Sequence, residues 1–460
     1  MIDNGKSLRD SKLARWTALG IVSFTMMAAY FFYDAMAPLK RMLEETQGWS
    51  SSDYGTFTSA YGWFNVFLLM LFFGGLLLDK KGIRFTGVTA TGLMVLGAFI
   101  KYAALSGILP TDGVLFGLRY QVLFASVGYA VFGIGSEVAG VVVSRVIVKW
   151  FKGYEMALAM GLQVAVARIG TGIAMLTANP LARYFNDVSG LLLFGVTLLA
   201  AGLLSFLMYN IAMDRRIDRQ TGNTTPSSGS EEEFKLSDVK IVATNYGFWL
   251  IALLCMLFYS CIFPFLKYAP DLMINKFGID EEWAGVVPSL LPIGTVILTP
   301  LFGYIYDHKG KGATIMLVGV LMLIGVHALF SLQGINNWVY AAILMMALGV
   351  AFSLVPSAMW PSIPKIIPEK QLGTAYALIF WVQNFGLWGI PLLIGQVLDK
   401  FCKTVSPSGN ISYDYTLPML IFLGLAVLSA VFALLLRRED RRKGYGLEYP
   451  NIERQKNTPL

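Results

Sequence analysis

Long apolar stretches alternate with short polar ones over most of the chain. The apolar windows are about 20 residues long, enough to cross a hydrocarbon core of roughly 30 Å as a helix. Charged residues and Gly or Pro turns bound them, and they predict twelve transmembrane helices in two groups of six. The first six are expected near residues 16–37, 54–78, 85–106, 114–148, 155–180 and 188–212. The second six are expected near residues 246–275, 283–306, 313–332, 338–361, 370–398 and 415–437.

One polar segment separates the two groups. Residues 213–245 are rich in charged residues, Gly, Ser, Thr and Pro, so they cannot bury enough apolar surface to fold into a membrane. We interpret them as a cytoplasmic linker between an N-terminal bundle, 16–212, and a C-terminal bundle, 246–437. Residues 1–15 and 438–460 are then cytoplasmic tails.

Composition and charge support an all-α integral membrane protein. The chain is 56% hydrophobic and only 14% charged, with a net charge of +7. Most Lys and Arg residues fall in loops on the side of the N-terminus, which predicts that both termini are cytoplasmic. An anionic inner leaflet attracts such loops, so the positive charge indicates contact with the lipid bilayer and no nucleic acid partner.

A short motif occurs once in each half of the chain. GGLLLDKKG at 74–82 and FGYIYDHKG at 302–310 match at a constant offset, and each lies between the second and third helix of its bundle. Internal repeats of this kind are typical of transporters that rock one bundle against the other. We therefore predict that the shared acidic and basic residues control conformation; they are Asp79, Lys81, Asp307 and Lys309.

The repeated loop resembles the motif of the major facilitator superfamily, and the resemblance covers residues 16–437. It implies twelve helices in two pseudo-symmetric six-helix bundles, around a central cavity that opens alternately to either side of the membrane. It says little about the substrate.

Two charges interrupt the apolar pattern of the N-terminal half. Glu137 lies in FGIGSEVAG, 132–140, and Arg168 lies in VARIG, 166–170, at equal distances from the basic turn KWFKGYE. In an antiparallel hairpin both would lie about 18 Å above the cytoplasmic surface, close to the middle of the membrane. An unpaired charge at that depth costs roughly 3 kcal/mol, so neither side chain is expected to face lipid.

Two interpretations of this pair remain open. The residues could form a structural ion pair between the fourth and fifth helices, although buried pairs often add little net stability. Alternatively they line a cavity, where Arg168 binds a carboxylate bidentately and Glu137 accepts from an ammonium. Together the two charges would then hold both ends of a zwitterion, which is the interpretation we favour.

Polar and aromatic residues elsewhere could complete such a cavity. In the C-terminal half, Asn384 corresponds to Arg168, so polar Asn384 and its neighbour Gln383 stand there in place of a charge. Aromatic residues with apolar bodies and polar tips are candidates for the walls. These are Trp360 in the C-terminal half and Tyr30, Tyr33, Tyr61 and Trp63 in the N-terminal half.

Several short sequence motifs narrow the resemblance further. FGIGSE, WFKG, GLQ, ARIG, YGWFNV, FPF and PEKQLGTAYALIFWVQNFGL together resemble the major facilitator superfamily domain-containing protein one family. Its animal members are lysosomal dipeptide uniporters with a glycosylated accessory subunit. The resemblance implies that Glu137 and Arg168 recognise the dipeptide termini and that Gln163, in GLQ, belongs to the same site.

This chain also departs from the animal members. Its outer loops are short, and its start has no acidic dileucine signal. We therefore expect a bacterial inner membrane, with a lysosomal membrane as the alternative. We expect a monomer; an accessory subunit is suggested only by the family.

The Cys, His and other reactive residues of the chain argue against an enzyme or a metalloprotein. Three Cys and two His residues form no metal or disulfide framework, and the sequence shows no nucleophile and base pattern, so we expect no enzyme, no metal and no cofactor. Asp34, near the outer end of the first helix, is a candidate for the outer gate. Lys267 is expected to snorkel to the outer interface.

One functional alternative stays open. A proton-coupled symporter or antiporter of organic anions would also use Arg168 for a carboxylate, with Glu137 as a proton site. The sequence favours uniport of dipeptides over this alternative.

Overall fold

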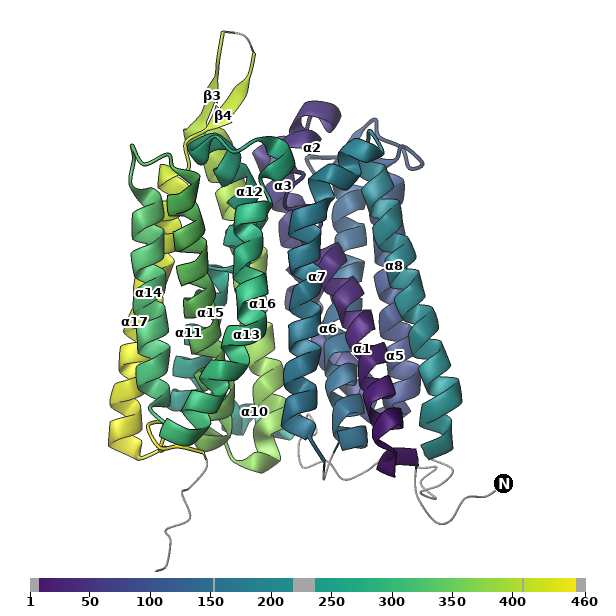
Figure 1. The fold of residues 1–460 in the computed structure, drawn as a ribbon, viewed down its shortest axis with the longest axis vertical. Coiled ribbons are helices and arrows are strands. Elements are labelled where there is room, and N and C mark those ends of the chain that lie inside the picture. Colours follow the sequence, from purple (N-terminus) through teal and green to yellow (C-terminus); the bar gives the residue numbers. More distant parts are fainter. Residues whose placement is uncertain (1–7, 152–153, 218–235, 408, 452–460) are drawn as a thin grey trace, which may run out of the picture.

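The computed structural model describes residues 8–151, 154–217, 236–407 and 409–451. Its helices run side by side, with those of the first half of the chain on one side and those of the second half on the other (Figure 1). We call the end with α2 and the hairpins the outer end, following the predicted orientation. The opposite end, where α1 begins and α17 finishes, is the inner end.

Five long helices form most of the N-terminal half. They are α1 Lys12–Asp34, α5 Met70–Leu105, α6 Tyr120–Phe151, α7 Met156–Tyr184 and α8 Val188–Tyr209. Shorter elements complete it: α2 Lys40–Gln47, α3 Ser51–Ser59, a 3-10 turn Ala60–Gly62, α4 Trp63–Phe67 and a hairpin of β1 Val114–Leu115 with β2 Leu118–Arg119. A π-helical turn, Asn210–Asp214, extends α8.

Seven helices form most of the C-terminal half. They are α11 Tyr246–Ser260, α12 Phe263–Phe277, α13 Val286–Lys309, α14 Gly312–Ser331, α15 Trp338–Ile366, α16 Leu372–Val397 and α17 Thr416–Lys443. A hairpin of β3 Lys403–Val405 with β4 Ile411–Tyr413 projects from the outer end. Pro264 lies in the first turn of α12, and α11 and α12 form one span with a break just before this proline.

Within the described residues, eleven helices are long and apolar enough to cross a membrane. One of them, α5, is interrupted at Gly82, where φ is 76° and ψ is 177°. Gly74, before this break, packs against Val138 of α6, and a Cβ on Gly87, after it, would lie 3.1 Å from Val142 of α6. The chain therefore reverses at Gly82, as the motif predicted.

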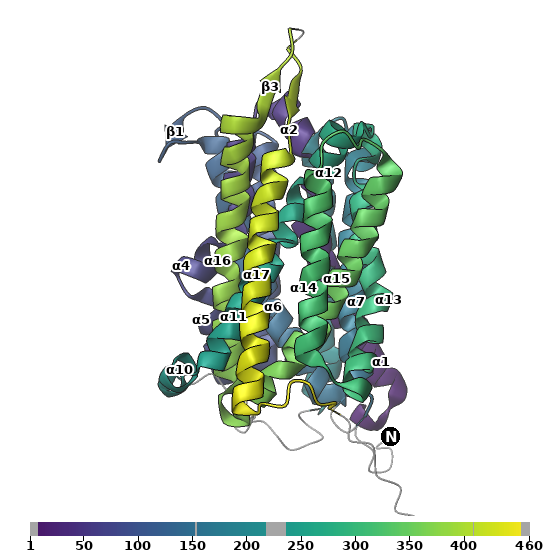
Figure 2. The same cartoon turned by 90° about the vertical axis from the view of Figure 1, so that its left-hand side faces the viewer.

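The predicted second helix is not continuous. It is divided among α3, the 3-10 turn, α4 and the first part of α5, and Leu69 between α4 and α5 has a left-handed φ of 53°. Figure 2 shows α4 at mid-height on the flank of the molecule. The all-α fold is confirmed, whereas the count of twelve spans stays a prediction.

Several helices begin or end a few residues away from the approximate boundaries expected from the sequence. α1 begins at Lys12, and α17 runs to Lys443, because the charged residues after 437 continue the helix. Part of the predicted linker forms α10, Leu236–Ala243, while 218–235 lie outside the described residues. The described end of the predicted C-terminal tail, 444–451, packs along the inner ends of α13 and α14.

The two halves touch closely at the outer end. A Cβ on Gly55 of α3 would lie 2.7 Å from the Pro391 carbonyl oxygen and 3.0 Å from the Gly395 Cα of α16. Only glycine permits this approach of two backbones. The structure is therefore closed at its outer end along α3 and α16.

Candidate functional site

Glu137 lies on the face of α6 that contacts the broken second helix. The Tyr61 hydroxyl donates a hydrogen bond to Glu137 Oε1 at 2.8 Å. The Tyr61 ring packs edge-on against the Tyr33 ring of α1, with centroids 4.7 Å apart. The predicted residues Glu137, Tyr61 and Tyr33 thus lie together, and Glu137 keeps its second oxygen for another partner.

Arg168 of α7 lies among aromatic rings. Its guanidinium carbon is 5.3 Å from the ring centroid of Tyr30, 5.3 Å from that of Phe263 and 4.8 Å from that of Phe352. Two of these rings come from the C-terminal half, so Arg168 faces the boundary between the halves. Such rings attract a cation by their quadrupole and still leave its hydrogen-bond donors available.

The two charged side chains do not neutralise each other. Both are described, and the ion pairs of the described residues do not include one between Glu137 and Arg168. The structural ion pair considered from the sequence is therefore not observed in this conformation. Because the carboxylate and the guanidinium are not paired with each other, each can bind a different charged group of one ligand.

The C-terminal half contributes an aromatic wall beyond Arg168. Tyr259 stacks on Phe263 with centroids 5.2 Å apart, and the Trp360 indole nitrogen donates to the Tyr259 hydroxyl at 3.1 Å. The predicted residue Trp360 therefore connects to the rings around Arg168 through Tyr259. It also stacks on Phe380 of α16, with centroids 5.0 Å apart.

The predicted polar residues of α16 are buried in this conformation. Gln383 accepts from the Cys255 thiol at 3.5 Å. Asn384 is 0% exposed; its Nδ2 donates to the Phe380 carbonyl oxygen, and its Oδ1 has no partner among the described residues. Gln163 of α7 is half-buried. A contact of Gln163, Gln383 or Asn384 with substrate stays a prediction.

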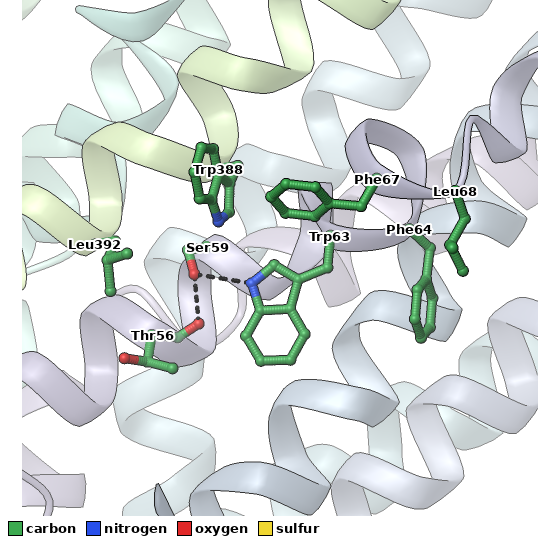
Figure 3. Close-up of a pocket in the computed structure, with 8 residues that line it drawn as sticks. All are labelled: Thr56, Ser59, Trp63, Phe64, Phe67, Leu68, Trp388 and Leu392. Atoms are coloured by element: carbon green, nitrogen blue, oxygen red, sulfur yellow. Dashed lines mark hydrogen bonds between the residues drawn. The ribbon is translucent and has the colours of Figure 1, made fainter. Parts of the chain in front are cut away.

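A separate cavity opens between α3 and α4 on one side and α16 on the other (Figure 3). It measures about 450 Å³, and its described lining is Thr56, Ser59, Trp63, Phe64, Phe67, Leu68, Trp388 and Leu392. The Trp63 indole nitrogen donates to the Ser59 hydroxyl at 3.2 Å, so Trp63 lines this apolar cavity rather than the surroundings of Glu137. Because the lining carries no charge, the cavity does not suit a zwitterion.

Asp34 forms a buried ion pair between the halves. Lys267 Nζ donates to Asp34 Oδ1 at 2.7 Å and to the Tyr33 carbonyl oxygen at 2.7 Å, and each charged residue is 4% exposed. The Thr171 hydroxyl donates to the other Asp34 oxygen at 2.8 Å. The prediction that Lys267 snorkels to the outer interface is wrong, because Asp34 supplies a buried counter-charge that the sequence of α12 alone does not reveal.

A second charged cluster closes the outer end above this pair. Lys40 Nζ lies 2.7 Å from Glu44 Oε1 and 3.0 Å from Asp271 Oδ2, and Tyr413 of β4 donates to Glu44 at 3.0 Å. Burial raises the pKa of the Glu44 carboxyl, against the opposing charge of Lys40. The outer closure thus has two charged layers, each made by residues of both halves.

The repeated inner loops have different partners in the two halves. Asp79 pairs with Arg145 of α6 at 3.3 Å, whereas Asp307 accepts from the Asn451 carboxamide at 2.8 Å. Both motif glycines, Gly82 and Gly310, have positive φ, at 76° and 68°. The basic residues Lys81 and Lys309 are exposed.

The sequence interpretation missed four residues of this region. Nothing in the sequence distinguishes Phe352 and Tyr259 from the other aromatic residues, since the chain has 31 Phe and 21 Tyr residues. Phe263 belongs to the FPF motif noted above. The fourth is Asn65 of α4, which is 1% exposed and whose two carboxamide atoms have no partner among the described residues. An unsatisfied buried polar group costs about 1–3 kcal/mol, so Asn65 requires an explanation.

Metal binding has no support in the described part of the chain. There, no group of three or more His, Cys, Asp or Glu residues is arranged to hold a metal ion.

Comparisons with known proteins agree with this fold. A family model described as Major Facilitator Superfamily matches residues 19–390. The chain is 30% identical over 458 residues to the lysosomal dipeptide transporter MFSD1 of Homo sapiens, covering 97% of this chain and 90% of that protein. It is 31% identical over 399 residues to the MFSD1 protein of Danio rerio, covering 84% of this chain and 81% of that protein.

A solved structure shows the same fold. The crystal structure of the nucleoside transporter NupG has a TM-score of 0.66 and 16% identity, covering 92% of this chain and 98% of that one. The chain therefore belongs to the major facilitator superfamily and, within it, to the family that the MFSD1 proteins represent. It is an integral multi-pass membrane transporter and not an enzyme. The choice between a bacterial and a lysosomal membrane stays a prediction.

Proposed function

We propose that this protein transports dipeptides by alternating access, as a uniporter. One observation carries the proposal: Glu137 and Arg168 come from adjacent helices of one half, yet each keeps its own surroundings. A dipeptide is a zwitterion whose ammonium and carboxylate are separated by one peptide unit. The names of the MFSD1 relatives support the same substrate class.

We assign a separate role to each charged group. Glu137 Oε1 is held by Tyr61, which leaves Oε2 for the substrate ammonium. Arg168 presents a planar fork that matches a carboxylate. The rings of Tyr30, Phe263 and Phe352 lie against the half-buried Arg168 and lower the polarity of its surroundings, which strengthens its attraction for that carboxylate.

Alternating access requires the outer closure to open. Asp34 and Lys267 belong to different halves, so their ion pair has to break when the outer ends separate. At the inner end, Asp79, Lys81, Asp307 and Lys309 would set the balance between the two states without contacting substrate.

The second candidate is a proton-coupled organic-anion carrier. The aromatic rings around Arg168 suit a ligand with one carboxylate and an apolar body, and this observation favours the second candidate. In that case Glu137 would bind a proton and no ammonium.

Uptake by proteoliposomes separates the two candidates. Purified protein should carry radiolabelled dipeptides inward until their concentrations inside and outside the vesicles are equal. An imposed pH gradient should not raise the internal concentration above the external one. Dipeptides should compete better than monocarboxylates or dicarboxylates. If a pH gradient drives accumulation, or if simple carboxylates compete better than dipeptides, the organic-anion function replaces this proposal.

A further prediction concerns the outer gate. Asp34→Asn leaves the Lys267 ammonium buried without a counter-charge in the outer-closed state, a loss of roughly 3–5 kcal/mol. The equilibrium should therefore shift toward the outer-open state. A reporter, Thr58→Cys, lies buried on α3, and its alkylation by a membrane-impermeant maleimide should be at least about 10-fold faster in the Asp34→Asn background.

A matched control is available within one half. Asp53 pairs with Arg119 at 2.9 Å, and both belong to the N-terminal half, so Asp53→Asn should leave the alkylation rate unchanged. The three natural cysteines are buried. Equal rates in the Asp34→Asn and Asp53→Asn backgrounds would show that Asp34 does not lock the outer end.

A further inference from the structure

Asn65 is a buried carboxamide that the proposed roles of Glu137 and Arg168 leave unused. It is 1% exposed, and neither its Nδ2 nor its Oδ1 has a hydrogen-bond partner among the described residues. It lies on α4, the short helix that breaks the second span. Buried polar groups without partners are rare, and at membrane depth no bulk water is available to satisfy them.

The packing places Asn65 at the depth of Glu137. The broken second span and α6 run in the same direction: Trp49 donates to Gln121 near the outer end, and further in, Gly133 of α6 packs on the Tyr61 backbone. Asn65 follows Tyr61 by four residues, and Glu137 follows Gly133 by four residues. Both residues therefore lie further toward the inner end by a similar distance, which places Asn65 near the depth of Glu137.

A second unsatisfied carboxamide comes from the other half. α4 packs against both α6 and α16. A Cβ on Gly62 would lie 3.2 Å from the Asn384 carbonyl oxygen, so Asn384 is close to the turn that precedes α4. Its Oδ1 is buried without a partner among the described residues.

We propose that Asn65 binds the peptide bond of the substrate. Its carboxamide donates to the peptide carbonyl and accepts from the peptide N–H, and Asn384 Oδ1 is a second acceptor from the opposite half. The inference rests on the proposed function, since a ligand held at its ammonium by Glu137 and at its carboxylate by Arg168 presents one peptide unit between them. That unit has one donor and one acceptor, which are the partners that a lone carboxamide lacks.

Two ligands test this role directly. Glycylglycine and 5-aminopentanoate have the same number of chain atoms between their charged ends, but 5-aminopentanoate has no peptide bond. The wild-type protein should bind glycylglycine at least about 10-fold more tightly, because a site built to hydrogen-bond a polar group rejects a ligand that lacks it. Asn65→Leu should remove this preference by weakening glycylglycine binding, while 5-aminopentanoate binding stays within about two-fold.

Asn210 offers a matched control. It is also buried, at 5% exposed, with both carboxamide atoms unpartnered among the described residues, but it lies in the π-helical turn at the inner end of α8. Asn210→Leu should keep the wild-type preference. If Asn65→Leu weakens both ligands equally, as a structural role would, the inference is overturned.

A third ligand needs no variant and covers the case in which Asn65→Leu does not fold. Glycylglycolate replaces the peptide N–H by an ester oxygen and keeps the carbonyl, so its affinity should lie between those of the other two ligands. Equal binding of all three by the wild type overturns the role of Asn65 and leaves dipeptide transport standing. Absence of any dipeptide binding overturns the proposed function together with this inference.

Discussion

Replacement of Arg168 by Ala is expected to lower dipeptide affinity by at least about 30-fold while the protein stays folded and monodisperse. Removing one partner of a desolvated charge pair costs roughly 2–5 kcal/mol. The fold should survive because, among the described residues, Arg168 forms no ion pair that the substitution would break, and it lies against three aromatic rings. Binding by thermal shift or calorimetry, together with size-exclusion chromatography, measures both outcomes.

The conservative substitution separates charge from geometry. Arg168→Lys should also fail, because an ammonium cannot reproduce the bidentate fork of a guanidinium on a carboxylate. Arg183, on the same helix, is a control, since it pairs with Glu281 at the partly exposed outer end and Arg183→Ala should keep affinity within about two-fold. If Arg168→Ala instead aggregates while Arg183→Ala does not, Arg168 has a structural role.

Much of the fold was predictable because membrane-spanning helices depend on local properties. Apolar length indicated the spans, and the repeated motif located two turns, where Gly82 and Gly310 have positive φ in the structure. The break in the second span was not predictable. Residues 60–69 are apolar apart from Asn65 and carry no proline. The break is supported by a distant group, since Trp381 of α16 donates to the Val66 carbonyl oxygen at 3.1 Å.

The candidate site was predictable where charge is rare and not where aromatic residues are common. Glu137 and Arg168 were conspicuous because charges seldom occur at mid-membrane depth. Phe263 and Phe352 could not be singled out, since packing across the two halves selects them from many similar rings. Lys267 was misassigned for the same reason, because its partner Asp34 is distant in sequence.

Capping either end of a dipeptide is expected to weaken its binding. N-acetylation removes the ammonium that we assign to Glu137, and C-terminal amidation removes the carboxylate that we assign to Arg168. A hydrogen bond to a charged group is worth about 1.5–3 kcal/mol, so each cap should cost on the order of 10- to 100-fold. Competition against a radiolabelled dipeptide measures both effects.

A variant then assigns the ammonium to Glu137. In Glu137→Gln the cap no longer removes a charge partner, so the penalty for N-acetylation should shrink while the penalty for C-terminal amidation stays unchanged. An N-methylated dipeptide is the steric control, since it keeps its positive charge and should bind within a few-fold of the free peptide. If N-acetylated and free dipeptides compete equally in the wild type, Glu137 does not hold an ammonium. The organic-anion function would then account better for a carboxylate that Tyr61 holds and for an arginine without an ion-pair partner among the described residues.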